Sequence, residues 1–125
     1  MKEDLAVALT VLFFAHYIFD FYCQSDSMAQ RKSKSIPALI IHTIVYSIGM
    51  WTVLGFTEFY LYGKASENIG IALLILMFSH FAIDYITSRL NSMFWEKEQR
   101  RKFFLCLGFD QFLHQVIIII IFLVI

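Results

Sequence analysis

IGIALLILMFSHFAIDYITSRL, the stretch Ile69–Leu90, decides the fold of this chain. It is long enough to cross the ~30 Å hydrocarbon core of a bilayer as one helix, which takes about 20 residues. Three further apolar stretches of comparable length are Leu5–Cys23, Ile36–Tyr62 and Phe103–Ile125. Because lipid cannot hydrogen-bond the backbone, we expect helix in each, even over the β-branched run Ile117–Ile121. The sequence therefore predicts an all-α, single-domain, four-helix transmembrane bundle.

The composition agrees with a chain surrounded by lipid. Of its 125 residues, 59% are hydrophobic and 16% are charged, whereas soluble domains carry about a quarter charged residues. Ten basic and ten acidic residues give zero net charge, so there is no electrostatic footprint for nucleic acid. The expected partner is the lipid bilayer. A homo-oligomer is a further expectation, because four helices enclose only a thin core.

Basic residues predict the orientation of the helices. Eight of the ten Lys and Arg residues lie in or beside two short loops, 24–35 and 91–102. Loops of this kind stay on the cytosolic side of a membrane. We therefore expect both loops to be cytosolic, both the N and C termini to lie outside, and the membrane to be the bacterial inner (cytoplasmic) membrane.

The chain contains an internal repeat of eight residues. FAHYIFDF, residues 14–21, and FSHFAIDY, residues 78–85, share the order aromatic, small, His, aromatic, apolar, apolar, Asp, aromatic. The two helices that carry them would run in the same direction. This predicts two parallel-related hairpins, with an axis along the membrane normal. His42 and His114 would then be loose counterparts on the other two helices.

Ionisable residues inside the apolar stretches are the candidate site. Three aspartates each lie four residues from a histidine, a spacing that places both side chains on one helix face. Counted from the expected cytosolic helix ends, all candidates lie roughly 6–16 Å deep, at 1.5 Å per residue. Four helices with unrelated sequences thus carry polar groups at one level. The candidate metal ligands are His16, Asp20, His42, His80, Asp84, Asp110 and His114.

The cost of burying these groups favours a cation. An ionised Asp near the bilayer centre costs about 2.5–3.5 kcal/mol, which a partner must offset. Histidines and carboxylates without thiolates suit a divalent transition metal such as Zn, Mn, Fe or Ni. Seven ligands suit one or two ions, with two ions sharing one carboxylate. Two alternatives remain: polar pairs that only join the helices, and a proton or ion path.

Polar neighbours extend the same helix faces toward the cytosolic side. Gln24 continues the stripe of Asp20, and Thr87, Ser88 and Asn91 continue that of Asp84. We expect a polar channel with basic residues at its mouth, which would suit a phosphate-bearing substrate. Ordinary positive loops explain the same basic residues equally simply. The expected mouth residues are Arg31, Lys32 and Arg89.

These motifs resemble an uncharacterised family of small bacterial and phage membrane proteins, domain of unknown function 3307. The matching residues run through nearly the whole chain: His16-x-x-x-Asp20-Phe21-x-x-Gln24, His42, His80-x-x-x-Asp84 and Asp110-Gln111-x-x-His114. The resemblance implies a polytopic membrane protein in which these polar residues recur. More distantly, the pattern is similar to membrane-bound metal-dependent hydrolases, an analogy that carries no substrate motif with it.

The leading hypothesis is a metal-dependent hydrolase of a lipid-linked or phosphate-bearing substrate. The metal would activate a bound water, and Asp110 would be the catalytic base. Gln24 and Gln111 would orient ligands or substrate around the ions. The rivals are a metal-ion or proton transporter or channel, and a non-catalytic accessory protein with a structural metal. The outer halves of the stretches Leu5–Cys23 and Phe103–Ile125 are almost wholly apolar, which argues against a path across the membrane.

Overall fold

The computed structural model describes residues 2–125, and these residues form helices and short connections without any strand. α1 passes directly into a single π-helical turn, η1, so that the two make one rod. The elements are α1 (Lys2–Tyr17), η1 (Ile18–Tyr22), α2 (Asp26–Arg31), α3 (Ile36–Tyr62), α4 (Ile69–Glu96) and α5 (Arg100–Val124). The predicted all-α fold is confirmed.

Four of these helices are long and apolar enough to cross a membrane: Glu3–Tyr22, Ile36–Tyr62, Ile69–Glu96 and Arg100–Val124. Large apolar side chains face outward from them, such as Phe78 with 74% of its surface exposed. An apolar exterior on helices of this length indicates an integral membrane protein in contact with a lipid bilayer.

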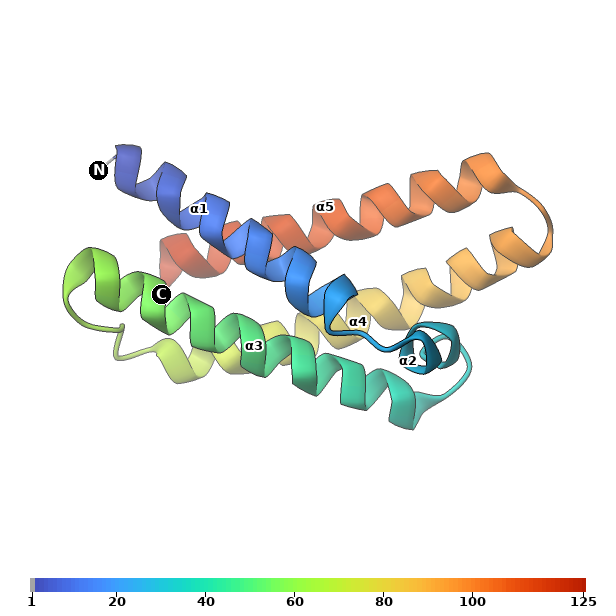
Figure 1. The fold of residues 1–125 in the computed structure, drawn as a ribbon, viewed down its shortest axis with the longest axis horizontal. Coiled ribbons are helices and arrows are strands. Elements are labelled where there is room, and N and C mark those ends of the chain that lie inside the picture. The colour runs from blue at the N-terminus through green and yellow to red at the C-terminus, as the bar shows by residue number, and fades with distance from the viewer. Residues whose placement is uncertain (1) are drawn as a thin grey trace.

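The helices form an up-and-down bundle (Figure 1). α1 and α4 run in one direction and α3 and α5 in the other, so both chain termini lie at the same end. α4 packs between α3 and α5, and α1 packs against α3 and, more lightly, α5. The two helices that carry the eight-residue repeat are therefore parallel, as the sequence predicts.

Two connections differ from the expected loops. α4 continues through Glu96, past Leu90, and α5 begins at Arg100, so only residues 97–99 connect them. Residues 91–96 include neither Gly nor Pro, so nothing there ends the helix at Leu90. The chain leaves the helix before Glu98, whose φ of 57° is left-handed. The expected loop 24–35 contains the short helix α2. The Ser25 and Ser35 side chains cap the first turns of α2 and α3 by accepting backbone N–H groups.

Unequal helix lengths leave one end of the bundle open. The α1 rod ends at Tyr22, just after Asp20, whereas α4 continues for twelve residues beyond Asp84. This extension corresponds to ~18 Å of helix. α4 and α5 therefore project past the end of the first rod, on the side of the bundle where α2 and the start of α3 lie (Figure 1).

The end that carries the termini is closed by packed apolar side chains. The core there includes the fully buried Leu12 and Met50. The space enclosed by Leu12, Met50, Leu54, Leu76, Ile118 and Ile121 is about 10 Å³. This is barely the space that one water molecule requires. The bundle is thus sealed on one side and open on the other.

Candidate metal centre

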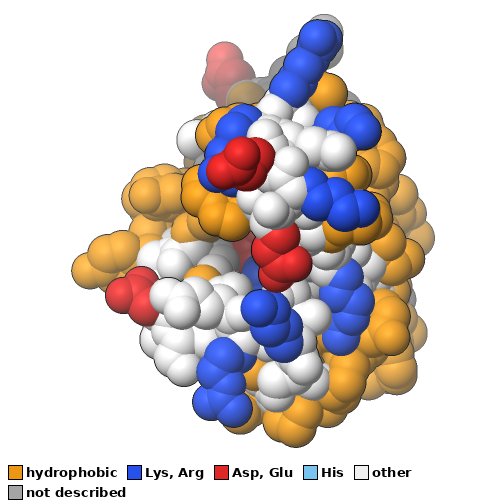
Figure 2. Space-filling model, turned by 90° about the vertical axis from the view of Figure 1, so that its right-hand side faces the viewer, with side chains coloured by type: hydrophobic (Ala, Val, Ile, Leu, Met, Phe, Trp, Pro, Cys, Tyr) orange, Lys and Arg blue, Asp and Glu red, His pale blue; other side chains and the backbone are white. Residues whose placement is uncertain are grey.

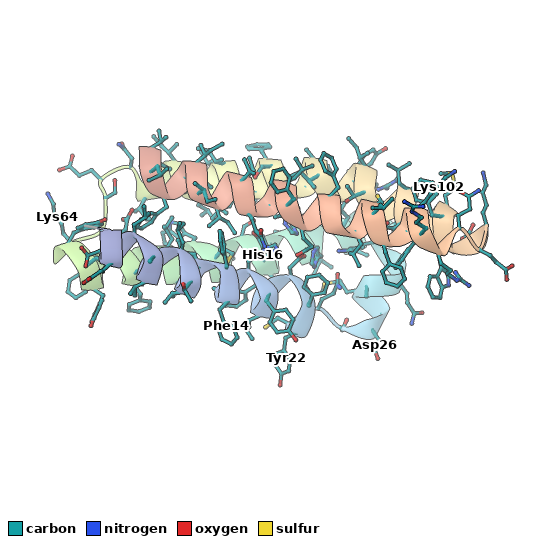
Figure 3. All side chains as sticks on the ribbon, turned by 90° about the horizontal axis from the view of Figure 1, so that it is seen from above. Phe14, His16, Tyr22, Asp26, Lys64 and Lys102 are labelled. Carbon is teal, nitrogen blue, oxygen red and sulfur yellow. The ribbon has the colours of Figure 1, made fainter. Side chains whose placement is uncertain are left out.

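All seven candidate ligands point into the bundle and none faces lipid. Figure 3 shows His16 directed between the helices, while Phe14 and Tyr22 of the same rod point outward. Every one of the seven side chains is at most 5% exposed. They come from all four membrane-spanning segments. Their side chains meet at one level inside the bundle, as the sequence predicts.

The π-helical turn places Asp20 within this cluster. The backbone N–H of Cys23 donates to the carbonyl of Ile18 at 2.8 Å, a bond that spans five residues instead of four. Beside the turn, the ring of Phe19 lies against Gly49, where an added Cβ would overlap it. Glycine at this point lets η1 approach α3 closely. Single π turns are frequent at functional sites.

Four residues form a first group, with Asp20, His42, His80 and Asp84 each offering one atom within 4.8 Å of the others. His42 Nε2 lies 3.1 Å from Asp20 Oδ1, 3.2 Å from Asp84 Oδ2 and 2.9 Å from His80 Nε2. His80 Nε2 lies 3.6 and 3.7 Å from the same two oxygens. Ligands of a tetrahedral ion bound at ~2.0–2.1 Å are about 3.3 Å apart. The five separations bracket that value.

A second group consists of Asp20, Asp110 and His114, again with one atom of each within 4.8 Å of the others. Asp20 therefore belongs to both groups. Thr87 Oγ1 donates to Asp110 Oδ1 at 2.5 Å, and Gln111 Nε2 donates to Asp110 Oδ2 at 2.8 Å. The carboxylate of Asp110 is held in place from both sides. The arrangement could hold two ions that share the carboxylate of Asp20.

His16 lies beside the two groups instead of within them. Its Nε2 is 2.8 Å from Gln111 Oε1, and its Nδ1 is 3.0 Å from the hydroxyl of Tyr46. An amide oxygen only accepts hydrogen bonds, so Nε2 must carry the proton, and Nδ1 then accepts from Tyr46. Both ring nitrogens are occupied. His16 therefore supports Gln111, whose Nε2 also donates to Asp20 Oδ2 at 3.0 Å.

The same contacts occur in both hairpins. Asp20 pairs with His42 of its own hairpin at 3.1 Å, and Asp84 pairs with His114 of the other at 3.3 Å. Within the helices, the distance from His16 to Asp20 is 3.8 Å and that from His80 to Asp84 is 3.7 Å. His42 and His114 are thus equivalent in the structure, because each contacts the aspartate of the repeat in its own hairpin.

Lys32 brings a charge into the site from outside the membrane-spanning segments. Its Nζ donates to Asp84 Oδ2 at 2.8 Å, and only 17% of the side chain is exposed. Burial lowers the pKa of the Lys32 ammonium, but the Asp84 and Asp20 carboxylates outweigh this and raise the pKa above its ordinary value. The site thus has one ammonium and the carboxyl groups of Asp20, Asp84 and Asp110. When these carboxyl groups are ionised, a bound cation would compensate the remaining negative charge.

A cavity of about 600 Å³ connects the site to the open end of the bundle. Asp20, Asp84 and Asp110 lie on its inner wall. Figure 2 looks at this end and shows a hollow among Lys and Arg side chains. An ion pair between Lys34 and Glu96, at 3.6 Å, lies at the mouth.

Of the three basic residues expected at the mouth, Lys32 is found there and the two arginines are not. Lys32 and Lys34 line the cavity, whereas Arg31 and Arg89 do not. The Arg89 guanidinium lies over the ring of its helix neighbour Tyr85, 3.8 Å from the centroid. Of the two glutamines, Gln111 bonds to Asp20 and Asp110, while Gln24 lines the cavity wall.

Tyr46 and Lys32 are the site residues whose roles the sequence did not reveal. The Tyr46 ring stacks on His80 with 3.7 Å between centroids and 12° between planes. Its position four residues after His42 puts it on the same helix face, which was the available signal. No signal in the sequence indicated that Lys32 would contact Asp84, because this contact depends on how the loop between η1 and α3 folds.

Together, four membrane-spanning helices and two buried His/Asp groups define a class: small integral membrane proteins with an intramembrane cluster able to hold metal ions. The particular family follows from a family model, described as "Protein of unknown function (DUF3307)", that matches residues 8–125. The chain belongs to this family, which confirms the resemblance drawn from its motifs. Comparisons with curated proteins and with solved structures found no match. The similarity to metal-dependent hydrolases is not among the findings.

Proposed function

We propose that the protein is a metal-dependent hydrolase that acts on a phosphate-bearing membrane lipid from the side of its basic loops. The observation that carries this proposal is that two potential ion sites share Asp20 at the inner wall of a cavity. Paired ions with a common carboxylate are a frequent arrangement in enzymes that cleave phosphate esters. Such ions activate water and neutralise the charge that develops on phosphoryl oxygens.

The residues around the ions have separate roles in this proposal. Asp20, His42, His80 and Asp84 hold the first ion, and Asp20, Asp110 and His114 hold the second. Gln111 and Thr87 fix the carboxylates by donating hydrogen bonds to them. Asp110 lies on the cavity wall and would accept the proton of the attacking water.

The cavity walls suit a molecule with an apolar and a polar part. Phe21 of η1 and Phe103 and Leu107 of α5 give the cavity apolar surface, and the polar stripe of α4 lines it as well. The first rod ends near the site, so a lipid would reach the ions between η1 and α5 without leaving the membrane. With the basic loops cytosolic, the substrate would come from the inner leaflet of the bacterial inner membrane.

Transport is less well supported by the same geometry. A path for ions needs polar groups or space on both sides of the site. Toward the termini, the site is followed by the packed apolar core around Leu12, Met50 and Ile118. A cavity open on one side fits an enzyme better than a channel.

The test is lipid hydrolysis by the purified protein in detergent, with Mn or Zn added. We expect release of a phosphate or headgroup from short-chain phospholipids, loss on chelation, and recovery when metal returns. Asp20→Asn should abolish turnover, because both ions depend on this residue. Glu58→Gln, which changes a buried carboxylate near the sealed end, is the matched control and should retain it. A wild-type protein that binds metal stoichiometrically but cleaves none of the short-chain phospholipids tested would contradict the proposal.

A further inference from the structure

Three polar atoms in the cavity are buried yet have no hydrogen-bond partner among the described residues. They are Gln24 Oε1, Ser88 Oγ and Asn91 Oδ1. All three residues line the cavity that leads to the candidate ions. Native proteins pair nearly all buried polar atoms. Three unpaired atoms on residues that line one cavity therefore point to a bound molecule that draws these side chains toward it and supplies the partners.

The three residues lie between the candidate ligands and the mouth of the cavity. Ser88 and Asn91 follow Asp84 on α4 by four and seven residues, and therefore lie ~6 and ~10 Å farther along the helix. Gln24 follows the end of η1 and lines the same cavity. In the proposed function, the phosphate of the substrate lies at the ions. A ligand that also contacted these three atoms would extend several bonds from its phosphate toward the mouth of the cavity.

The chemistry of the three groups selects the ligand. The orphan atoms are two amide oxygens and one hydroxyl oxygen, and all can accept hydrogen bonds. Amides and a hydroxyl also donate, so the best match is a group that does both, such as the hydroxyls of a polyol or sugar. The carboxylate at the mouth, Glu96, is already paired with Lys34 at 3.6 Å and offers no free partner to an ammonium group. A quaternary amine is best held by several aromatic faces together. Of the rings that line the cavity, Trp95 is covered by Arg100 at 3.8 Å and packs against Phe103, which leaves Phe21 without a second ring beside it in the cavity.

We propose that Gln24, Ser88 and Asn91 form a second binding site, which recognises a hydroxyl-bearing headgroup of the phosphate substrate. This inference rests on the proposed function for the position of the phosphate, and it adds the class of headgroup. The substrate is then a phospholipid with a polyol or sugar beyond the phosphate. A free polyol phosphate would offer the same hydroxyls without the lipid chains.

Binding separates these possibilities without requiring turnover. The metal-loaded protein is mixed on ice with one of three dioctanoyl phospholipids: phosphatidylglycerol, phosphatidylethanolamine or phosphatidylcholine. sn-Glycerol 3-phosphate is a fourth probe for a water-soluble ligand. Native mass spectrometry gives the amount bound, and the mass of each bound species shows whether it is intact or cleaved. We expect phosphatidylglycerol to bind roughly tenfold more tightly than phosphatidylcholine, the equivalent of one or two hydrogen bonds.

Variants locate the preference in the chain. Gln24→Leu and Asn91→Leu should bind phosphatidylglycerol and phosphatidylcholine equally while keeping the metal content of wild type. Gln115→Leu makes the same change on α5 outside the cavity and should keep the preference. Ser88→Ala is the smaller change, and it should weaken the preference even if a leucine variant fails to fold.

Each outcome decides between the two proposals. Equal binding of all three lipids to the wild-type protein would overturn the second site. A preference for phosphatidylglycerol over phosphatidylcholine that persists in the variants would overturn it as well. If glycerol 3-phosphate bound more tightly than phosphatidylglycerol, the second site would stand, but its ligand would be a water-soluble phosphate instead of a lipid. A preference for phosphatidylglycerol that is lost in Gln24→Leu, combined with no cleavage of phosphatidylglycerol in the hydrolysis assay of the purified protein, would support the site and overturn hydrolysis.

Discussion

Asp20 and Asp84 lie on either side of one imidazole, with His42 Nε2 3.1 Å from Asp20 Oδ1 and 3.2 Å from Asp84 Oδ2. The two aspartates occupy equivalent positions in the eight-residue repeat, one on η1 and one on α4. A neutral imidazole has at most one proton on Nε2 and can satisfy one of these oxygens fully. A cation at this position would satisfy both and would use the nitrogen as a donor.

If Asp20 is shared, its loss should affect more metal than the loss of any other ligand. Asp20→Ala should reduce the metal content from about two ions per chain to less than one. Asp84→Ala and His114→Ala should each remove about one ion, because each belongs to one group. Elemental analysis of purified variants after dialysis measures this, with Glu58→Gln as the control. Equal losses in all three variants would argue against a shared carboxylate.

Lys32 should compete with metal for Asp84. Its ammonium is charged near neutral pH and lies 2.8 Å from Asp84 Oδ2, one of the atoms of the first group. Lys32→Gln removes this charge, so affinity for the first ion should rise, by roughly tenfold or more. Titration against a competing chelator measures the change. Lys34→Gln, at the exposed ion pair with Glu96, should change affinity little. Weaker binding in Lys32→Gln would show that the lysine supports the site.

His16 should influence the site through Gln111 instead of by binding metal. Tyr46→Phe removes the hydroxyl that lies 3.0 Å from His16 Nδ1. Both Tyr46→Phe and His16→Gln should still bind two ions at saturation, with affinity lowered about 10- to 100-fold, as is typical when a supporting partner is lost. The same chelator titration gives both numbers. Loss of a whole ion in His16→Gln, as expected for His42→Gln, would make His16 a direct ligand.

Gly49 should be required for the position of η1. A Cβ at this residue would overlap the ring of Phe19, whereas a Cβ at Gly55 on the same helix would meet nothing within 4 Å. Gly49→Ala should therefore lower stability by about 1–3 kcal/mol, the usual cost of overpacking, and reduce metal content by displacing Asp20. Gly55→Ala should be neutral or slightly stabilising. Thermal unfolding followed by circular dichroism, with metal analysis, compares the two. Equal behaviour would contradict the importance of this contact.

The general fold and the candidate ligands could be predicted because they depend on local patterns. Hydrophobic length identified the four helices, and the four-residue spacing of His80 and Asp84 placed both on one face. The parallel relation of α1 and α4 followed from the alternating direction of successive membrane spans, and it made the repeat interpretable as two related hairpins. These features need only the geometry of a single helix and the solvent around it.

Other features depended on contacts between distant parts of the chain. The π turn at Ile18–Tyr22 leaves no clear signal in the sequence, and without it the position of Asp20 between two groups was not predictable. The fold of the loop that brings Lys32 to Asp84 was equally hidden. Arg31 and Arg89 were expected at the cavity mouth from their order in the chain, but their side chains turn elsewhere. Loop conformation decides such details.

Anomalous X-ray scattering from crystals grown with Zn or Mn tests the central claim most directly. The account predicts two peaks about 3.5–4 Å apart, one among Asp20, His42, His80 and Asp84 and the other among Asp20, Asp110 and His114. A single peak, peaks that do not adjoin Asp20, or metal-saturated protein without a peak in the bundle would contradict it.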